Sequence, residues 1–246
     1  MRHLAAALAA VAAVAICGCG GAASSEGGRP TVFAASSLTE VLTELDPDAR
    51  YNFAGSDQLA FQITEGAPAD VFAAASPRHP QALFAKGLLR RPRTFATNTL
   101  VLIVPRANRA GMIHSVADLD EPGVKLVVGD AGVPVGDYTR QMLERLGRED
   151  LLDRVVSRED DVRSVTAKVS LGEADAGFVY ATDVAPVADA VRAIRLPARA
   201  QPAIDYQVGV VRASGNSAVA EAFIARLLGP DGRRVLAAHG FGLPGR

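Results

Sequence analysis

The sequence predicts an α/β fold of two similar lobes, each a mostly parallel sheet flanked by helices, with a ligand cleft between them. Short apolar runs alternate with segments of helical periodicity, which is the pattern of parallel sheets. The alternation starts again in mid-chain, and a chain of 246 residues holds more of these units than one sheet takes comfortably. Open parallel sheets bind ligands beyond the carboxyl ends of their strands, so two facing sheets form a binding cleft.

The first part of the body reads as three strand–helix units followed by a continuous apolar strand. Ser37 and Glu40 have the spacing of a capping box, which predicts that a helix opens at Ser37. The turn Gly55-Ser56-Asp57 begins a second helix, and Pro77 begins a third. The strands expected here are 31–35, 50–54, 70–74 and 100–104.

The second part repeats this pattern and then returns to the first lobe. The expected strands are 125–129, 155–156, 176–180, 191–195 and 204–211, and the expected helices are 138–146, 160–171, 218–228 and 234–238. The apolar runs 100–104 and 204–211 are the natural connections between the lobes. We therefore expect lobe I to comprise 31–102 and 206–246, with lobe II (103–205) inserted into it.

The N-terminus has the pattern of a secretory signal peptide. A basic start precedes an apolar stretch (4–16) that is too short to span a bilayer, which needs about 20 apolar residues. Ile16-Cys17-Gly18-Cys19 resembles a bacterial lipobox, and the small Gly18 favours lipidation of Cys19 over Cys17. We expect a signal peptide (1–18), a lipidated flexible tether (19–30), and a secreted protein anchored to the outer face of the cell membrane.

The composition and motifs argue against several classes of function. The chain has 26 Lys and Arg against 27 Asp and Glu, which disfavours a nucleic-acid surface. The four histidines show no metal-ligand spacing, and no Gly-x-Ser-x-Gly nucleophile motif occurs. The Gly-x-Gly-x-x-Gly match at 240–245 ends the chain with no helix after it to receive a pyrophosphate. We therefore expect no enzyme, no cofactor and no nucleic-acid partner.

Five turns rich in small residues follow strands or open helices, and they are the candidate binding elements. Unpaired N–H groups and the positive end of the dipole make a helix N-terminus favourable for an anion. Taken singly, each turn also has a structural interpretation, with Ser37 and Ser56 as helix caps and Tyr180 as a buried aromatic. The turns are 35–37, 54–56, 133–136, 159–162 and 179–183.

Several blocks of sequence, in order, resemble the molybdate-binding component of bacterial ABC importers. These blocks are 32–39, 53–56, 62–72, 129–136, 159–163 and 177–183. The resemblance implies a two-lobe periplasmic-binding-protein (type II) architecture and a monomer. It also implies capture of molybdate and tungstate in the cleft for delivery to an ABC permease. In that family neutral hydrogen-bond donors hold the oxyanion, so molybdenum enters only as molybdate, without direct protein ligands to the metal.

Carried over by position, the resemblance assigns five donors. Ser37 and Ser56 would donate through hydroxyl and backbone N–H, Val135 and Val162 through backbone N–H, and Tyr180 through its hydroxyl. The second turn departs from the family pattern because the carboxylate of Asp57 stands near the expected anion, so we expect Asp57 to point away or to act as a cap. The alternative function is binding of another tetrahedral oxyanion, such as sulfate or thiosulfate.

Overall fold

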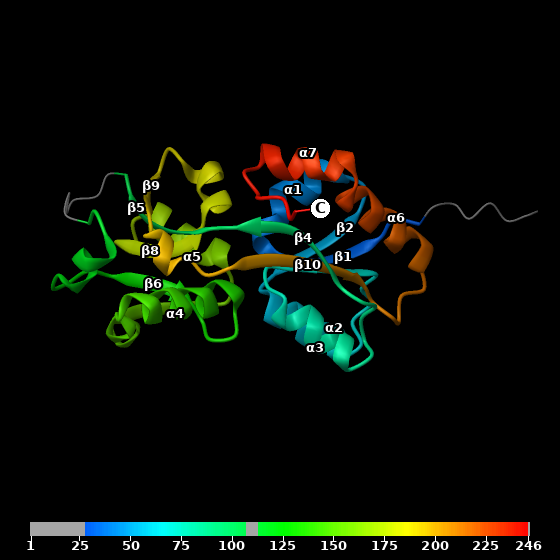
Figure 1. Ribbon diagram of the computed structural model, residues 1–246, viewed down its shortest axis with the longest axis horizontal. Coiled ribbons are helices and arrows are strands. Elements are labelled where there is room, and N and C mark those ends of the chain that lie inside the picture. Colours follow the sequence, from blue (N-terminus) through cyan, green and yellow to red (C-terminus); the bar gives the residue numbers. More distant parts are fainter. Residues whose placement is uncertain (1–27, 107–112, 246) are drawn as a thin grey trace, which may run out of the picture.

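The computed structural model describes residues 28–106 and 113–245 and contains two five-stranded sheets. The sheets lie side by side in Figure 1, and helices flank each of them. We use lobe I for the part built on the first sheet and lobe II for the part built on the second. The predicted signal peptide and the two cysteines, Cys17 and Cys19, lie outside the described residues.

The sheet of lobe I has the strand order β2-β1-β3-β10-β4. Its strands are β1 (Thr31–Ala35), β2 (Arg50–Ala54), β3 (Val71–Ala74), β4 (Arg93–Asn98) and β10 (Ile204–Val210). β1 pairs in parallel with β2 and β3, whereas β10 runs antiparallel to both β3 and β4. Four strands therefore share one direction and β10 runs against them, which fits the prediction of a mostly parallel sheet.

The sheet of lobe II repeats this plan in the order β7-β6-β8-β5-β9. Its strands are β5 (Leu100–Pro105), β6 (Leu126–Gly129), β7 (Val155–Glu159), β8 (Ala176–Tyr180) and β9 (Val191–Arg195). β6 pairs in parallel with β7 and β8, and β5 is the one reversed strand. The two lobes are thus similar in topology.

Helices cover both faces of the first sheet, with α2 and α3 on one side and α1, α6 and α7 on the other (Figure 1). The helices of lobe I are α1 (Thr39–Leu45), α2 (Ser56–Thr64), α3 (Arg78–Ala85), α6 (Ser217–Leu228) and α7 (Pro230–Ala238). Those of lobe II are α4 (Pro134–Leu146) and α5 (Val162–Ser170). Short 3-10 turns occupy Ser36–Leu38, Val116–Asp120, Glu149–Asp153, Ala181–Val187 and Ala198–Ala200. No helix in the described part of the chain is long and apolar enough to cross a membrane.

The chain passes between the lobes at two places. It leaves lobe I at Thr99, the single residue between β4 and β5, and it returns between β9 and β10. The change of sheet at Thr99 precedes the predicted boundary after residue 102, because the whole of β5 pairs with β8 and β9 of lobe II. Both connections are short, which suits a hinge between two rigid bodies.

Several local features differ from the expectations. β4 was not predicted, because its sequence Arg-Thr-Phe-Ala-Thr-Asn lacks a strong apolar pattern. α4 begins at Pro134 rather than at residue 138, since proline is well tolerated in the first turn of a helix. Ser37 does not cap α1: residues 36–38 form a 3-10 turn, the N-cap is Leu38, and no side chain bonds to it.

Candidate functional site

A small cavity lies between the lobes, where the first turns of several helices meet. Its volume is about 10 Å³. Residues of both lobes line it: Ala35, Ser36, Ser37, Ala54, Gly55, Ser56, Ala75, Val133, Pro134, Val135, Asp161, Val162 and Tyr180. All five donors predicted from the sequence are in this set, so the fold brings four separate turns and the end of β8 into one site.

Lobe I contributes two serines whose hydroxyl groups are already oriented by the protein. Ser56 is the first residue of α2, and its Oγ accepts the backbone N–H of Ala75 at 3.1 Å. The Ser56 hydroxyl therefore bonds to the residue that follows β3 and does not cap its own helix, and its proton is free to be donated. Ser37 Oγ lies 3.0 Å from the hydroxyl of Tyr206. Both serines are buried.

Lobe II contributes the N-termini of α4 and α5. The first backbone N–H groups of a helix have no partner within it, so those of Val135 and Val162 are available as donors. α4 packs tightly on the end of β6: a Cβ on Gly136 would lie 2.2 Å from the carbonyl oxygen of Asp130. This glycine lets the helix begin close to the strand and fixes where its N–H groups lie.

Tyr180 ends β8 and presents a hydroxyl without a partner. The residue is only 1% exposed, and its Oη makes no hydrogen bond among the described residues. Burial raises the pKa of Tyr180 well above its usual value, with smaller contributions from Tyr206, Tyr138 and Asp183, so the hydroxyl keeps its proton. A buried donor left unpaired costs about 1–3 kcal/mol, and a ligand that accepts a hydrogen bond would recover that cost.

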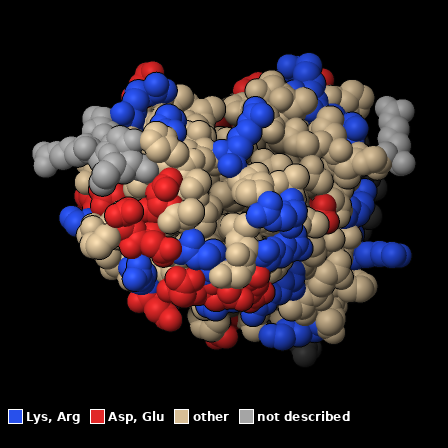
Figure 2. All heavy atoms as spheres, turned by 60° about the vertical axis from the view of Figure 1, so that its left-hand side comes forward, with Lys and Arg blue, Asp and Glu red and all other residues tan. Residues whose placement is uncertain are grey.

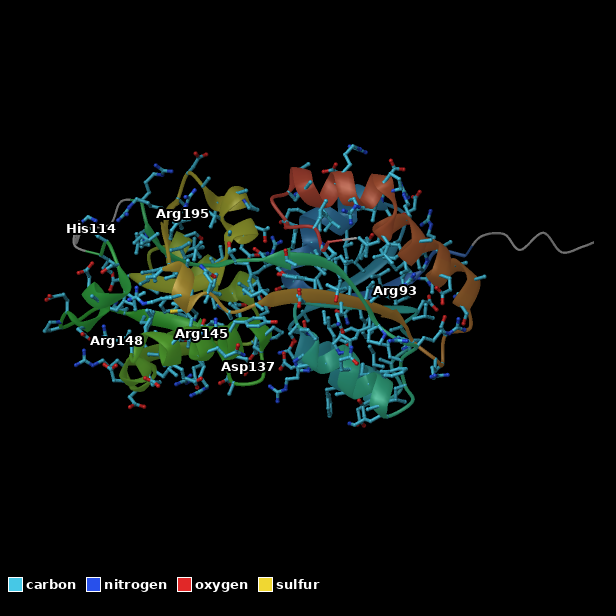
Figure 3. The ribbon with its side chains drawn as sticks, in the orientation of Figure 1. Arg93, His114, Asp137, Arg145, Arg148 and Arg195 are labelled. Carbon is cyan, nitrogen blue, oxygen red and sulfur yellow. The ribbon has the colours of Figure 1, made fainter. Side chains whose placement is uncertain are left out.

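The cavity holds no basic side chain among its described lining residues. The labelled Arg93, Arg148 and Arg195 lie away from the junction of the lobes (Figure 3), and Arg163 pairs with Glu40 at 2.6 Å instead of lining the cavity. In the view that brings lobe II forward, basic side chains lie next to acidic ones (Figure 2). An anion in this cavity would therefore be held by neutral donors, which are effective when they are preorganised and dry.

Two carboxylates lie at or near the cavity, those of Asp161 and Asp57. Asp161 caps α5, and its Oδ1 accepts from the backbone N–H of Ser164 at 3.0 Å and from Ser36 Oγ at 3.2 Å. Asp57 is not among the lining residues of the cavity, and it caps no helix: its Oδ1 is buried without a hydrogen-bond partner among the described residues.

Asp183 is a buried carboxyl group beside the site, and it accepts the backbone N–H of Tyr180 at 3.1 Å. Burial raises its pKa to about 8, and the nearby carboxylates of Glu40 and Asp161 act in the same direction. Arg163 and the Tyr180 hydrogen bond act in the opposite direction. At neutral pH Asp183 is therefore mostly uncharged and adds little negative charge next to the cavity.

The lobes touch on both sides of the cavity, as in a closed cleft. Ser36 of lobe I reaches Asp161 of lobe II, and Glu40 pairs with Arg163. On the opposite side Arg78 pairs with Asp137 at 2.5 Å, and Asp137 lies at the edge of lobe II that faces lobe I (Figure 3). The backbones meet at Gly55, where an added Cβ would lie 2.3 Å from the carbonyl oxygen of Asp160.

Sequence reasoning did not assign three residues that the geometry brings into or next to the site. Ser36 and Asp161 stood inside predicted turns but were not distinguished from their neighbours, because only the folded chain shows that they bond across the cleft. Tyr206 reads as an ordinary core position of β10. No cluster of three or more His, Cys, Asp or Glu side chains that could hold a metal ion occurs among residues 28–106 and 113–245.

Two lobes with short connections, closing on a small cavity of preorganised donors, define a protein that captures a small solute. The sequence comparison agrees: residues 30–242 match the family model described as bacterial extracellular solute-binding protein. The chain belongs to this family, among its ModA-like members.

Curated relatives cover nearly the whole chain. The molybdate-binding protein ModA of Mycobacterium tuberculosis (strain ATCC 25618 / H37Rv) is 39% identical over 95% of this chain and 94% of its own length. ModA of Escherichia coli (strain K12) is 32% identical over 90% of this chain and 91% of its own. Among solved structures, the periplasmic molybdate-binding protein of Azotobacter vinelandii shares the fold, with a TM-score of 0.78, 24% identity, and coverage of 88% of this chain and 100% of that one.

Proposed function

We propose that this protein captures molybdate between its lobes and delivers it to the membrane permease of an ABC importer. The proposal is supported by relatives named molybdate-binding proteins and by the site itself. The observation that carries it most is the buried hydroxyl of Tyr180, which has no hydrogen-bond partner among the described residues and lies in a cavity without a basic lining side chain. The carboxylate of Asp161 also lines the cavity, but it already accepts hydrogen bonds from Ser36 and Ser164. A fully ionised tetrahedral oxyanion offers four acceptors and no donor, which is the complement of such a site.

The binding step is proposed to use five donors and no catalytic group. The hydroxyls of Ser37, Ser56 and Tyr180 and the backbone N–H groups of Val135 and Val162 surround the anion. The protein acts by binding and release, with no reaction and no cofactor, and a single chain forms the whole site. Tungstate has nearly the same size and charge as molybdate, so it is expected to bind too. Sulfate is smaller and would make longer hydrogen bonds in the same shell.

The location of the protein follows from the expected processing of its N-terminus. We propose that the signal peptide ends before Cys19, that this cysteine carries the lipid, and that the tether places the two lobes at the outer face of the membrane. The closed form, with both lobes in contact, is then the form presented to the permease. Such a protein is expected to partition into detergent when expressed with its own leader, and Cys19→Ser would remove that behaviour whereas Cys17→Ser would not.

Isothermal titration of the purified protein with molybdate, tungstate and sulfate in one buffer tests the proposed ligand. We expect one-to-one binding of molybdate and tungstate, and little or no heat from sulfate at the same concentrations. Equal or tighter binding of sulfate would favour the alternative oxyanion function over molybdate. Failure to bind any of the three would contradict an oxyanion site and return Ser56 to a purely structural role.

A further inference from the structure

The hydroxyl proton of Ser37 has two alternative directions, toward Tyr206 or toward the cavity. Ser37 Oγ and Tyr206 Oη lie 3.0 Å apart and both side chains are buried. Each hydroxyl has one proton, so one member of the pair donates and the other accepts. Ser37 keeps its own proton for an oxyanion only if Tyr206 is the donor.

The side-chain amide of Asn98 settles this direction. The backbone N–H of Thr99 lies 2.9 Å from one end of that amide, and because a backbone N–H only donates, the facing atom is Oδ1. The other end, Nδ2, then donates to Thr182 Oγ1 at 2.9 Å and to Tyr206 Oη at 3.4 Å. Tyr206 Oη is an acceptor in that bond, and among the described residues Ser37 Oγ is the one hydrogen-bond partner left to take its buried proton.

Packing holds the ring of Tyr206 in the position that this bond requires. The side chain is fully buried, and aromatic rings contact it edge-on from three sides: Phe95, Tyr180 and Phe241, at centroid distances of 6.0, 5.8 and 5.4 Å. Burial also raises the pKa of Tyr206 well above its usual value, so its hydroxyl is protonated at physiological pH. Within the described residues its hydrogen-bond partners are Ser37 and Asn98.

We propose that Tyr206 and Asn98 are positioning residues that orient the Ser37 hydroxyl through a directed chain of hydrogen bonds. Asn98 Nδ2 donates to Tyr206, Tyr206 donates to Ser37, and Ser37 donates to the bound oxyanion. The inference rests on the proposed function, because it assigns the last bond to a ligand. Asn98 precedes Thr99, where the chain crosses between the lobes, and its amide also donates to Thr182 of lobe II. The same amide therefore links the two lobes and orients the Ser37 hydroxyl through Tyr206.

A double-mutant cycle on oxyanion affinity tests this chain. The variants are Ser37→Ala, Tyr206→Phe and the double variant, titrated calorimetrically with molybdate, tungstate and sulfate, using whichever anion the wild type binds. Ser37→Ala is expected to weaken binding by about tenfold or more, as for loss of a hydrogen bond to a charged group. Tyr206→Phe is expected to weaken it measurably but by a smaller factor, because Ser37 keeps its proton and loses only the bond that orients it. The double variant is expected to bind no more weakly than Ser37→Ala, because Tyr206 acts only through Ser37.

Tyr51→Phe is the matched control. It also removes a tyrosine hydroxyl from lobe I, one that donates to the backbone carbonyls of Leu42 and Asp46 away from the cavity. We expect its affinity to equal that of the wild type even if its melting temperature falls. A general effect of losing a hydrogen-bonded tyrosine hydroxyl would instead weaken both Tyr206→Phe and Tyr51→Phe.

Asn98→Asp provides a second, independent variant. An aspartate presents an acceptor to Tyr206, so the chain reverses and Ser37 turns its proton away from the cavity. We expect the oxyanion affinity of Asn98→Asp to fall about as far as that of Ser37→Ala. The variant that carries both changes is expected to bind as strongly as Ser37→Ala alone. Plain repulsion by the new charge would persist in the combined variant and would contradict the proposal.

The possible failures are distinguishable. Wild-type affinity in Tyr206→Phe, or losses that add in the double variant, would overturn the hydrogen-bond chain while leaving the proposed oxyanion function intact. If the wild type binds none of the three anions, the proposed function itself fails and the chain fails with it.

Discussion

The hydroxyl oxygen of Tyr180 is the single atom that points most strongly to a ligand. Its hydroxyl is buried and has no hydrogen-bond partner in the described part of the chain, although buried hydroxyls normally find one. The ring is held by edge-on contacts with Tyr138 and Tyr206, so the hydroxyl has a fixed place at the cavity wall. An unsatisfied group of this kind lowers the stability of the empty protein and strengthens binding of an acceptor.

Tyr180→Phe is therefore expected to act in opposite directions on stability and affinity. Removing the unpaired hydroxyl leaves the free energy of unfolding of the empty protein unchanged or higher by up to about 1 kcal/mol. Oxyanion affinity falls by about tenfold or more, as for loss of a hydrogen bond to a charged group. Thermal unfolding and calorimetric titration measure the two effects, and equal affinity in both proteins would show that Tyr180 does not contact the ligand.

Asp183 makes stability depend on pH in a defined window. Its pKa rises from 3.8 in the unfolded chain to about 8 in the folded protein, chiefly through burial. The unfolded chain ionises first as pH rises, so the contribution of Asp183 to stability is fully present below about pH 4 and is lost by about pH 8.

Asp183→Asn removes this titration and keeps an acceptor for the N–H of Tyr180. Relative to the variant, the wild type is expected to lose stability between about pH 5 and pH 8, by at most about 1.4 kcal/mol per pH unit. Denaturant unfolding of both proteins across that range measures the difference. Parallel pH profiles would contradict the assignment of a raised pKa.

The sequence predicted the site better than it predicted the roles of individual side chains. All five expected donors line the cavity because they stand where strands end or helices begin, which local patterns reveal. The capping role expected of Ser37 was wrong. Its hydroxyl instead forms a hydrogen bond with Tyr206, which lies 169 residues later in the chain. Such long-range bonds, and the one from Ser36 to Asp161, have no signature in a single sequence.

Three helices begin around the cavity. α2, α4 and α5 each start at the cavity wall, and the N–H groups of Val135 and Val162 in the first turns of α4 and α5 have no partner within their helices. The boundaries of most elements followed from periodicity, whereas β4 did not, because its place at the sheet edge beside β10 depends on a strand from the far end of the sequence.

Gly55→Ala tests the approach of the lobes at the start of α2. An alanine Cβ there would collide with the carbonyl oxygen of Asp160 in lobe II, 2.3 Å away. We expect oxyanion affinity to fall by at least about tenfold, as when closure is hindered, with little change in the melting temperature of the empty protein. Gly215→Ala is the control because nothing lies within 4 Å of its added Cβ. Wild-type affinity in Gly55→Ala would contradict closure at this contact.

The two lobes together form a site whose charge balance differs from that of most anion sites. The chain has a formal net charge of -1, and no basic side chain lines the cavity among the described residues. The interlobe ion pairs Glu40–Arg163 and Arg78–Asp137 are largely exposed and contribute little on their own. Binding is therefore expected to depend on dry, oriented dipoles rather than on attraction by cations.

A weak dependence of affinity on salt follows from this balance. Raising sodium chloride from about 50 mM to about 500 mM is expected to change the dissociation constant for molybdate by less than about threefold, because neutral donors in a closed site are poorly screened. Calorimetric titrations at several salt concentrations measure the slope. A loss of tenfold or more would indicate a cationic contribution that the cavity does not show.

The most direct test is a crystal structure of the protein grown with molybdate, with anomalous data collected at the molybdenum edge. The account predicts one strong anomalous peak inside the cavity, with oxygen atoms within hydrogen-bond distance of the Ser37, Ser56 and Tyr180 hydroxyls and of the N–H groups of Val135 and Val162. A peak beside an arginine outside the cavity, or a cavity that stays empty while the protein binds molybdate in solution, would contradict it.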